Sequence, residues 1–244
     1  MIISSTPWQT CPDCLPQLQP GQIHLWRFSL DIIPPLYQSQ RAFLSDDELA
    51  RADRFLDPQK QQQFTLARSY LRQILAQYLD LPPELIKFIY NDAGKPSLGE
   101  KNRNNLTFNL SHSGAMAVLA VAIDVDLGVD IEEIDFDLNF QSLAIRYFTP
   151  AEIIKLKEVS IARQRRQFYR IWTSKEAVLK MIGSGFSAAE PPGNFMQHGC
   201  LRNIFFAGNY VSAIAINRRI TSILKFNILE SESGENSPLT PKNC

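Results

Sequence analysis

An apolar segment at residues 115–125 constrains the fold of this chain more than any other stretch. It is far shorter than the about 20 residues that cross a bilayer, and its nearly continuous run of Ala, Val and Ile predicts a strand buried on both faces. A turn at Asp126-Leu127-Gly128 follows it. The chain then enters a second predicted strand, Gly128-Val129-Asp130-Ile131-Glu132, which carries the first functional signal.

This second strand places two carboxylates on one face. Side chains alternate along a strand, so Asp130 and Glu132 point the same way, with Cα atoms about 6.6 Å apart. Oxygen ligands at this spacing can converge on a hard divalent cation, and magnesium is the natural candidate. Taken alone, the pair could also be an exposed acidic strand end beside a turn.

The composition is that of an ordinary globular protein. Hydrophobic residues make up 45% of the chain and charged residues 20%, and 25 Lys and Arg balance 25 Asp and Glu. Because the formal net charge is zero, no overall electrostatic attraction draws the chain to nucleic acid or to a membrane, and any anionic ligand must be held by local clusters of basic residues. No Lys or Arg precedes Arg27, which excludes an ordinary secretory signal, and a cytoplasmic protein is expected.

Both ends of the chain are expected to lie outside the folded halves. Residues 1–22 are predicted to form an irregular N-terminal segment, and residues 231–244 a disordered tail. Cys11-Pro12-Asp13-Cys14 has the spacing of a metal or redox motif, but no second Cys pair accompanies it. We favour two free thiols over a metal or redox role.

Two helix starts follow a first predicted strand at residues 23–31. Ser45-Asp46-Asp47-Glu48 is a capping box, which predicts a short helix to about residue 55 with Arg51 and Arg54 on one face. Asp57-Pro58 predicts a long helix to about residue 80, which includes Arg68 and Arg72. On helix evidence alone, these arginines would form a solvated face.

The remaining pattern favours an α+β fold. Residues 87–91 and 106–113 are predicted strands, and Gly94-Lys95-Pro96 lies in a turn between them. Thr149-Pro150-Ala151-Glu152 begins another helix, a further helix is predicted at 163–182, and two or three strands complete the chain to residue 229. The halves 23–114 and 115–230 thus each run strand, helices, strands, which permits a duplicated α+β unit.

Lys175 lies in the middle of an apolar stripe on the helix predicted at 163–182. An ammonium group there is unfavourable unless it meets an anion. Glu176 and Lys180 line one edge of the stripe, four residues apart, where they could form a simple helix ion pair. With the strand carboxylates, they supply what a magnesium-pyrophosphate site requires: oxygen ligands for the metal and cations for the phosphate charge. The stripe consists of Phe168, Ile171, Trp172, Val178, Leu179 and Ile182.

Three segments of the sequence resemble the signatures of the 4′-phosphopantetheinyl transferases. They are Phe108-Asn-Leu-Ser-His-Ser113, Gly128-Val-Asp-Ile-Glu132 and Trp172-Thr-Ser-Lys-Glu-Ala177 followed by Lys180. Their order and spacing resemble the monomeric, surfactin-synthetase-activating (Sfp) type in its Trp-x-x-Lys-Glu-Ala variant, over about residues 45–186. The resemblance implies a pseudo-twofold duplication of an α+β unit with the active site between the halves. It also implies transfer of the phosphopantetheine arm of coenzyme A to a serine of an apo carrier protein, with magnesium as cofactor and 3′,5′-ADP as product.

The resemblance further assigns roles to individual residues. Asp130, Glu132 and Glu176 match the family's magnesium-binding acids. Lys180 matches the lysine that meets the pyrophosphate, and Lys175 is its neighbour in the Lys-Glu pair. The residues implied to contact coenzyme A are Ser111 and His112, the turn Gly94-Lys95-Pro96 at the adenine end, and Arg51, Arg54 and Arg68 around the 3′-phosphate.

A carboxylate must accept the proton of the attacking serine. Glu176 is the first choice, and Glu152, which matches an acid at the start of the helical region, is the second. The sequence does not decide between them, because an acid that binds the metal has a lowered pKa and is a weaker base. Two other functions fit parts of the pattern, a metal-dependent phosphodiesterase and a non-catalytic coenzyme-A-binding protein. The first would not need Ser111 and His112, and the intact charged motif positions count against the second.

A basic run just before Trp172 is the candidate surface for the carrier protein. Carriers of the kind that this family modifies, in fatty-acid, polyketide or peptide synthesis, are typically acidic around their serine, so a local basic patch could dock them. The alternative is a solvated basic helix face. The run contains Arg163, Arg165, Arg166 and Arg170.

Overall fold

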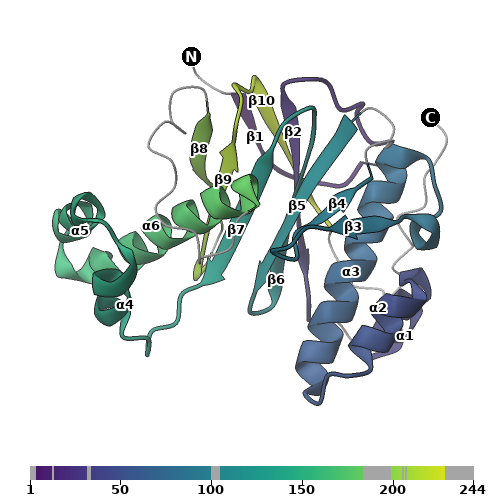
Figure 1. Cartoon of the computed structure of the whole chain (residues 1–244), viewed down its shortest axis with the longest axis horizontal. Helices are drawn as coiled ribbons and strands as arrows, with labels where there is room; N and C mark the ends of the chain where they lie inside the picture. Colours follow the sequence, from purple (N-terminus) through teal and green to yellow (C-terminus); the bar gives the residue numbers. More distant parts are fainter. Residues whose placement is uncertain are drawn as a thin grey trace. The chain divides into compact units, whose positions relative to one another are not determined.

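The computed structural model describes residues 4–12, 14–31, 34–99, 105–183, 199–204, 206 and 208–228. The chain divides into two compact units (Figure 1). The first unit runs to Val125 and resumes at Ile220, and the second spans Asp126–Arg219. The tail predicted at 231–244 lies outside the described residues.

The helices and strands are distributed over both units. The first unit contains β1 (Ser4–Thr10), β2 (Gln22–Ser29), α1 (Pro34–Gln40), the 3-10 turn η1 (Arg41–Phe43), α2 (Asp46–Ala52), α3 (Pro58–Leu79), η2 (Pro83–Leu85), β3 (Phe88–Tyr90), β4 (Pro96–Leu98), β5 (Leu106–Ser113), β6 (Met116–Ile123) and β10 (Ser222–Asn227). The second unit contains β7 (Leu127–Glu133), α4 (Phe140–Tyr147), α5 (Pro150–Lys157), α6 (Ile161–Ile182), β8 (Cys200–Ile204) and β9 (Tyr210–Ile216). The prediction of an α+β fold is confirmed.

The first unit is built on a five-stranded mixed sheet with the order β1-β10-β2-β6-β5. β10 pairs in parallel with β1 and with β2, whereas β2, β6 and β5 pair antiparallel. Residues 117–122 of β6 are buried on both faces, as the apolar run predicted. A separate hairpin pairs β3 with β4.

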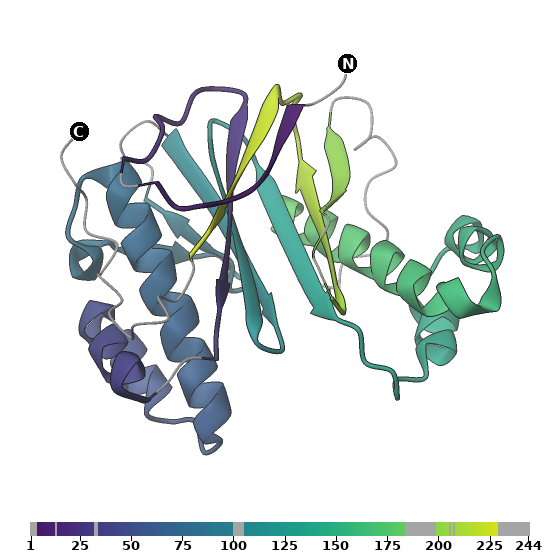
Figure 2. The same ribbon diagram turned by 180° about the vertical axis from the view of Figure 1, so that it is seen from behind.

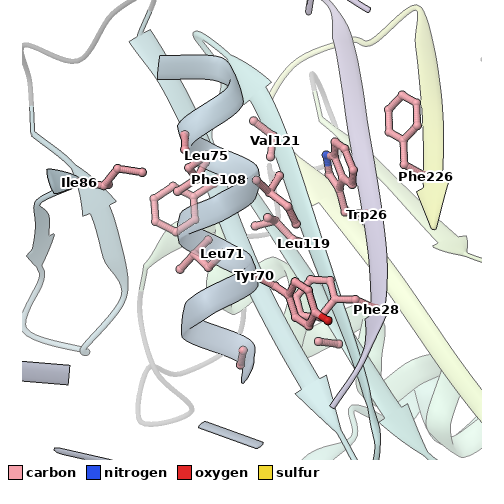
Figure 3. Packing of buried hydrophobic residues seen from close by; sticks show 14 of the residues in the cluster. Trp26, Phe28, Tyr70, Leu71, Leu75, Ile86, Phe108, Leu119, Val121 and Phe226 are labelled. Atoms are coloured by element: carbon pink, nitrogen blue, oxygen red, sulfur yellow. The ribbon is translucent and has the colours of Figure 1, made fainter. Parts of the chain in front are cut away.

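Helix α3 packs against one face of this sheet, and the hydrophobic core of the first unit lies between the helix and the sheet. Leu71 and Leu75 of α3 approach Phe108 of β5 (Figure 3). Aromatic rings extend the core along the sheet: Phe28 lies 4.9 Å from Tyr70, and Trp26 lies 4.8 Å from Phe226, centroid to centroid.

In the second unit, α6 packs against a three-stranded antiparallel sheet, whose strand order is β7-β9-β8. Helices α4 and α5 pack near the N-terminal end of α6 (Figure 2). The ring of Phe168 stacks on Phe148 and Trp172 there, at centroid distances of 5.2 Å and 5.7 Å.

The two units share an order of elements. In the first, β2 is followed by α3 and then by β5 and β6, and the strands lie in the order β2-β6-β5. In the second, β7 is followed by α6 and then by β8 and β9, and the strands lie in the order β7-β9-β8. Each unit therefore contains a first strand, a long helix and two further strands that pair antiparallel with each other. The second of these two strands (β6 or β9) also pairs with the first strand of its unit (β2 or β7).

Two predicted boundaries are wrong. The segment 1–22 is not irregular throughout, because β1 is held by pairing with β10, more than 200 residues away, a partner that no local pattern reveals. The division lies after Val125 and not after residue 114, because β6 hydrogen-bonds to β2 and β5 of the first unit.

Two smaller findings concern the cysteines and the membrane. Cys11 is a free thiol, whereas Cys14 is disulfide-bonded, so the prediction of two free thiols is wrong for Cys14. The spacing of the two cysteines could not show which of them is oxidised. In the part of the chain that the structure describes, no helix combines the length and the apolar character needed to cross a membrane.

Candidate active site

Strand β7 carries the two acids predicted to bind metal. Val129 and Ile131, at the alternate positions, are fully buried. Asp130 is 3% exposed, and Glu132 is half-buried. β7 pairs with β9 along its whole length, and the Ser212 hydroxyl donates a 2.6 Å hydrogen bond to the carbonyl oxygen of Asp130. This ladder fixes the backbone from which both carboxylates project.

Helix α6 approaches β7 closely because residue 128 is glycine. A Cβ atom at Gly128 would overlap the carbonyl oxygen of Ala177 and the amide nitrogen of Met181. These atoms belong to the helix backbone, so no side-chain rotation could relieve the overlap. Gly128 therefore allows α6 to lie against the strand, with Glu176 and Lys180 one residue before those two contacts.

A polar contact between helix α6 and strand β7 joins Lys180 to Asp130. The Lys180 ammonium group donates a 2.7 Å hydrogen bond to Oδ1 of Asp130, whose side chain is 4% exposed. The Lys180 side chain is 31% exposed, so it is partly open to solvent. The predicted pyrophosphate lysine and a predicted metal ligand thus meet in one place.

Glu176 shares an electrostatic environment with both strand acids. Burial, followed by the negative charges of Asp130 and Glu132, raises the pKa of Glu176 to about 7, against the opposing effect of Lys180. Carboxylate oxygens are the hard donors that a magnesium ion prefers, and Glu176 is the acid on α6 whose charge interacts with both strand acids. Among the described residues, no group of three or more His, Cys, Asp or Glu side chains is already arranged around a metal position.

Lys175 finds the anion that its place on the apolar stripe requires. Its ammonium group donates a 2.8 Å hydrogen bond to Oε2 of Glu152. The same oxygen accepts from the Thr149 amide at 2.8 Å and the Thr149 hydroxyl at 3.1 Å. The capping box that starts α5 is therefore also the counter-charge of Lys175, and the prediction that Lys175 meets an anion is confirmed.

The first unit holds the residues predicted to contact coenzyme A. On β5, Ser111 is buried and His112 is exposed. Gly94 has φ +77°, the left-handed conformation expected of the predicted turn. Asn91 closes this turn, because its carbonyl oxygen accepts from the Gly94 amide and its side chain accepts from the Lys95 amide, both at 2.8 Å.

Two of the three predicted phosphate-binding arginines are exposed. Arg51, in the last turn of α2, places its guanidinium 5.1 Å from the ring centre of Phe64. Arg54 donates from Nε to the Ala50 carbonyl oxygen at 3.1 Å. Both guanidinium groups lie at the surface, where a phosphate can reach them.

Arg68, the third arginine predicted to lie around the 3′-phosphate, has different surroundings. Arg68 is 8% exposed and forms a buried ion pair with Glu48. The sequence showed Glu48 only as part of a capping box, and its contact with two arginines was missed. Arg68 and Arg72, four residues apart on a helix that follows such a glutamate, are the signal that could have suggested it.

The basic run on α6 is only partly available to a partner. Arg165 donates to the carbonyl oxygens of Asp135 and Leu138, at 2.7 Å and 2.9 Å, and so holds the loop before α4. Arg163 and Arg170 are exposed, whereas Arg166 is half-buried. The run is thus neither a uniform docking patch nor a uniform solvated face.

Two family descriptions match most of the described chain. Residues 126–202 match the 4′-phosphopantetheinyl transferase superfamily, and residues 33–124 match the family described as 4′-phosphopantetheinyl transferase, N-terminal. The boundary between the two matches coincides with the division after Val125.

Curated relatives with this activity in their names are similar over much of the chain. The 4′-phosphopantetheinyl transferase HetI of Nostoc sp. is 41% identical over 170 residues, which cover 69% of this chain and 72% of HetI. The 4′-phosphopantetheinyl transferase psf-1 of Bacillus pumilus is 35% identical over 60% of this chain and 61% of its own length. The L-aminoadipate-semialdehyde dehydrogenase-phosphopantetheinyl transferase of Mus musculus is 30% identical over 58% of this chain and 49% of its own length.

Proposed function

This chain belongs to the 4′-phosphopantetheinyl transferase superfamily, and we propose that it moves the phosphopantetheine arm of coenzyme A onto a serine of an apo carrier protein, with magnesium as cofactor and 3′,5′-ADP as product. The observation that carries this proposal is the meeting of Asp130 from one signature with Lys180 from another at 2.7 Å, beside Glu176. Carboxylates and an ammonium group together are what pyrophosphate chemistry requires.

Asp130, Glu132 and Glu176 would hold the magnesium ion, directly or through water, together with phosphate oxygens of the substrate. When bound, the metal would neutralise charge on the pyrophosphate as the phosphorus–oxygen bond breaks. Lys180 supports the same task, because its side chain is partly exposed and its ammonium group, beside Asp130, would meet a phosphate oxygen there. Lys175, held by Glu152, adds a second cation on the same helix.

Glu176 is the proposed acceptor of the serine proton. In the metal-free protein the pKa of Glu176 is raised to about 7, which makes it more basic than an ordinary carboxylate and opposes the lowering that a bound metal would cause. Glu152 is the weaker candidate because one of its oxygens already accepts from Thr149 and Lys175. We therefore assign Glu152 a positioning role for Lys175.

The donor substrate would be bound by residues of the first unit. Arg51 and Arg54 would pair with the 3′-phosphate of coenzyme A, because exposed guanidinium groups make charge-assisted hydrogen bonds to phosphate. The turn Gly94-Lys95-Pro96 and the pair Ser111 and His112 would contact the remainder of the molecule. The enzyme would act as a monomer, as the family resemblance implies, and in the cytoplasm, as its N-terminal sequence predicts.

The shared order of elements supports an origin by duplication. β2, α3, β5 and β6 of the first unit correspond to β7, α6, β8 and β9 of the second, with the same strand order in each sheet. β1 and β10 would then be additions to the outer edge of β2.

A mass spectrum of an apo carrier protein tests the proposed function. Incubation with this protein, coenzyme A and magnesium should add one phosphopantetheine group to the carrier and release 3′,5′-ADP. A phosphodiesterase would cleave coenzyme A and leave the carrier mass unchanged, and a non-catalytic binding protein would change neither.

A further inference from the structure

A buried cluster of charged side chains in the first unit is not used by the proposed reaction. Glu48 is 3% exposed and accepts from Arg68 through one carboxylate oxygen and from Arg72 through the other. The second oxygen also accepts from the Ser45 amide at 3.2 Å, which closes the capping box of α2. One carboxylate therefore joins the start of α2 to two successive turns of α3.

Arg68 extends this cluster to the hairpin. Its NH2 group donates to the Tyr90 hydroxyl at 2.9 Å, and its guanidinium lies 4.6 Å from the ring centre of Phe88. Both residues belong to β3, and Tyr90 pairs with Pro96 at the start of β4. Arg68 thus connects α2, which carries Arg51, with the hairpin that carries the Gly94-Lys95-Pro96 turn.

Arg72 closes the cluster from the other side. Its NH1 group donates to the carbonyl oxygens of Pro83 and Ile86, both at 2.9 Å, and its NH2 group donates to the Ser45 hydroxyl at 2.8 Å. The segment that leads into β3 is therefore fastened to the same guanidinium as the N-cap of α2.

The other contacts of helix α2 lie at its C-terminal end, where Arg41 donates to Asp53 at 2.9 Å and Gln61 donates to the carbonyl oxygen of Ala52 at 3.2 Å. Helix α2 has seven residues, which is too short for a helix that is stable by itself. Its buried residues are Glu48 and Ala52, one turn apart, and Ala52 offers little apolar surface. The Glu48 carboxylate is therefore the buried attachment of the N-terminal end of α2, and it contributes to the position of Arg51 and Arg54 at the other end.

We propose that Glu48 and Arg68 are positioning residues of the coenzyme A phosphate site: they hold the arginines at the end of α2 in a fixed place relative to the β3–β4 turn. This inference rests on the proposed function, since it deepens the account of how the donor substrate is bound. It also replaces direct contact of Arg68 with the 3′-phosphate by an action through Arg51 and Arg54.

The test compares the affinities of coenzyme A and dephospho-coenzyme A, measured by calorimetry on the full-length protein without a carrier. The wild type should prefer coenzyme A. Glu48→Gln should reduce this preference several-fold, and Arg68→Gln should do the same, because either change releases α2. Arg68→Lys, which keeps the charge but cannot reach both partners, should lie between Arg68→Gln and the wild type. Asp46→Asn, an exposed acid two residues before Glu48, is the matched control and should keep the wild-type preference.

Tyr90→Phe provides a second, gentler variant in case Glu48→Gln does not fold. It removes only the hydroxyl that Arg68 contacts, on a side chain that is 45% exposed. A reduced preference for coenzyme A in Tyr90→Phe, with an unchanged unfolding temperature, would support a positioning role.

Three outcomes would overturn the inference. Glu48→Gln and Tyr90→Phe could both keep the full preference while only their stability changes, which would make the cluster purely structural. Arg68→Gln alone could lose the preference while Glu48→Gln keeps it, which would mean that Arg68 contacts the phosphate itself. Equal affinity of the wild type for coenzyme A and dephospho-coenzyme A would show that the protein has no site for the 3′-phosphate. The proposed function fails separately, because it would be contradicted by a protein that binds coenzyme A but modifies no carrier.

Discussion

The Lys180 ammonium group lies 2.7 Å from Oδ1 of Asp130, although 50 residues separate the two in the chain. Strand β7 supplies the acid and helix α6 the lysine, and a glycine at position 128 allows the two elements to touch. The site therefore depends both on these charges and on the close packing of α6 against β7.

Gly128→Ala should disturb the packing of α6 on β7. The added Cβ would overlap helix backbone, so we expect the free energy of unfolding to fall by about 3 kcal/mol. Urea unfolding followed by circular dichroism measures the change. Gly99→Ala is the matched control, because a Cβ there would meet only the Ile89 side chain, at 3.4 Å. Equal stability losses in the two variants would mean that α6 does not depend on Gly128.

Glu176→Gln should change how stability depends on pH in metal-free buffer. The folded-state pKa of Glu176 is raised from 4.5 to about 7, so between these values the folded state binds more protons than the unfolded state. Stability of the wild type should therefore fall as pH rises through this window. Glu176→Gln lacks the titrating group, so its advantage over the wild type should grow from pH 4.5 to about 7 and then level off. Parallel curves of unfolding temperature against pH would show that Glu176 does not titrate in this way.

Glu152→Gln and Glu176→Gln should have different effects on transfer. Loss of the charge at Glu152 weakens the α5 cap and leaves Lys175 without its carboxylate, so we expect a stability loss of about 1–2 kcal/mol. The transfer rate per folded molecule should stay within roughly tenfold of the wild type, since Glu152 acts through Lys175. Glu176→Gln should abolish transfer. Single-turnover kinetics with a saturating carrier measures both, and the reverse ranking would make Glu152 the base.

The sequence was sufficient for the local parts of this structure. The capping boxes at Ser45 and Thr149 and the alternation that puts Asp130 and Glu132 on one face depend on neighbouring residues, and the helices and strand are present where these patterns predicted them. The α+β class follows from such elements.

Contacts between distant segments could not be predicted in the same way. The burial of Arg68 depends on Glu48 and Tyr90, residues 20 and 22 positions away, and its charge by itself suggested a surface role. Strand β1 depends on β10 at the other end of the chain. The need for an anion near Lys175 was predictable, but its identity as Glu152 depends on how α5 packs on α6.

The carrier should dock through the exposed members of the basic run. Arg163→Glu combined with Arg170→Glu should raise the KM for an acidic carrier at low salt, with little change in coenzyme A affinity, because exposed charges act mainly on association. The wild-type rate at low carrier concentration should fall as salt rises, and the double variant should show a flatter dependence. Arg165 stays unchanged because it holds a loop.

Arg218→Glu combined with Arg219→Glu is the control for the docking prediction, since it makes the same charge change at exposed positions of the second unit. If both double variants raise the KM equally, the effect comes from net charge and the docking surface lies elsewhere. If neither does, the basic run is a solvated helix face.

Magnesium dependence of transfer by the wild type and by Asp130→Ala shows whether Asp130 holds a metal ion that transfer requires. Mass spectrometry should follow the mass gain of an apo carrier with coenzyme A, first in EDTA and then with increasing magnesium, with Glu133→Gln as a control at the exposed neighbouring strand position. The account predicts no transfer in EDTA, recovery with magnesium in the wild type and Glu133→Gln, and no recovery in Asp130→Ala. Wild-type transfer that persists in EDTA, or near-normal transfer by Asp130→Ala in magnesium, would contradict it.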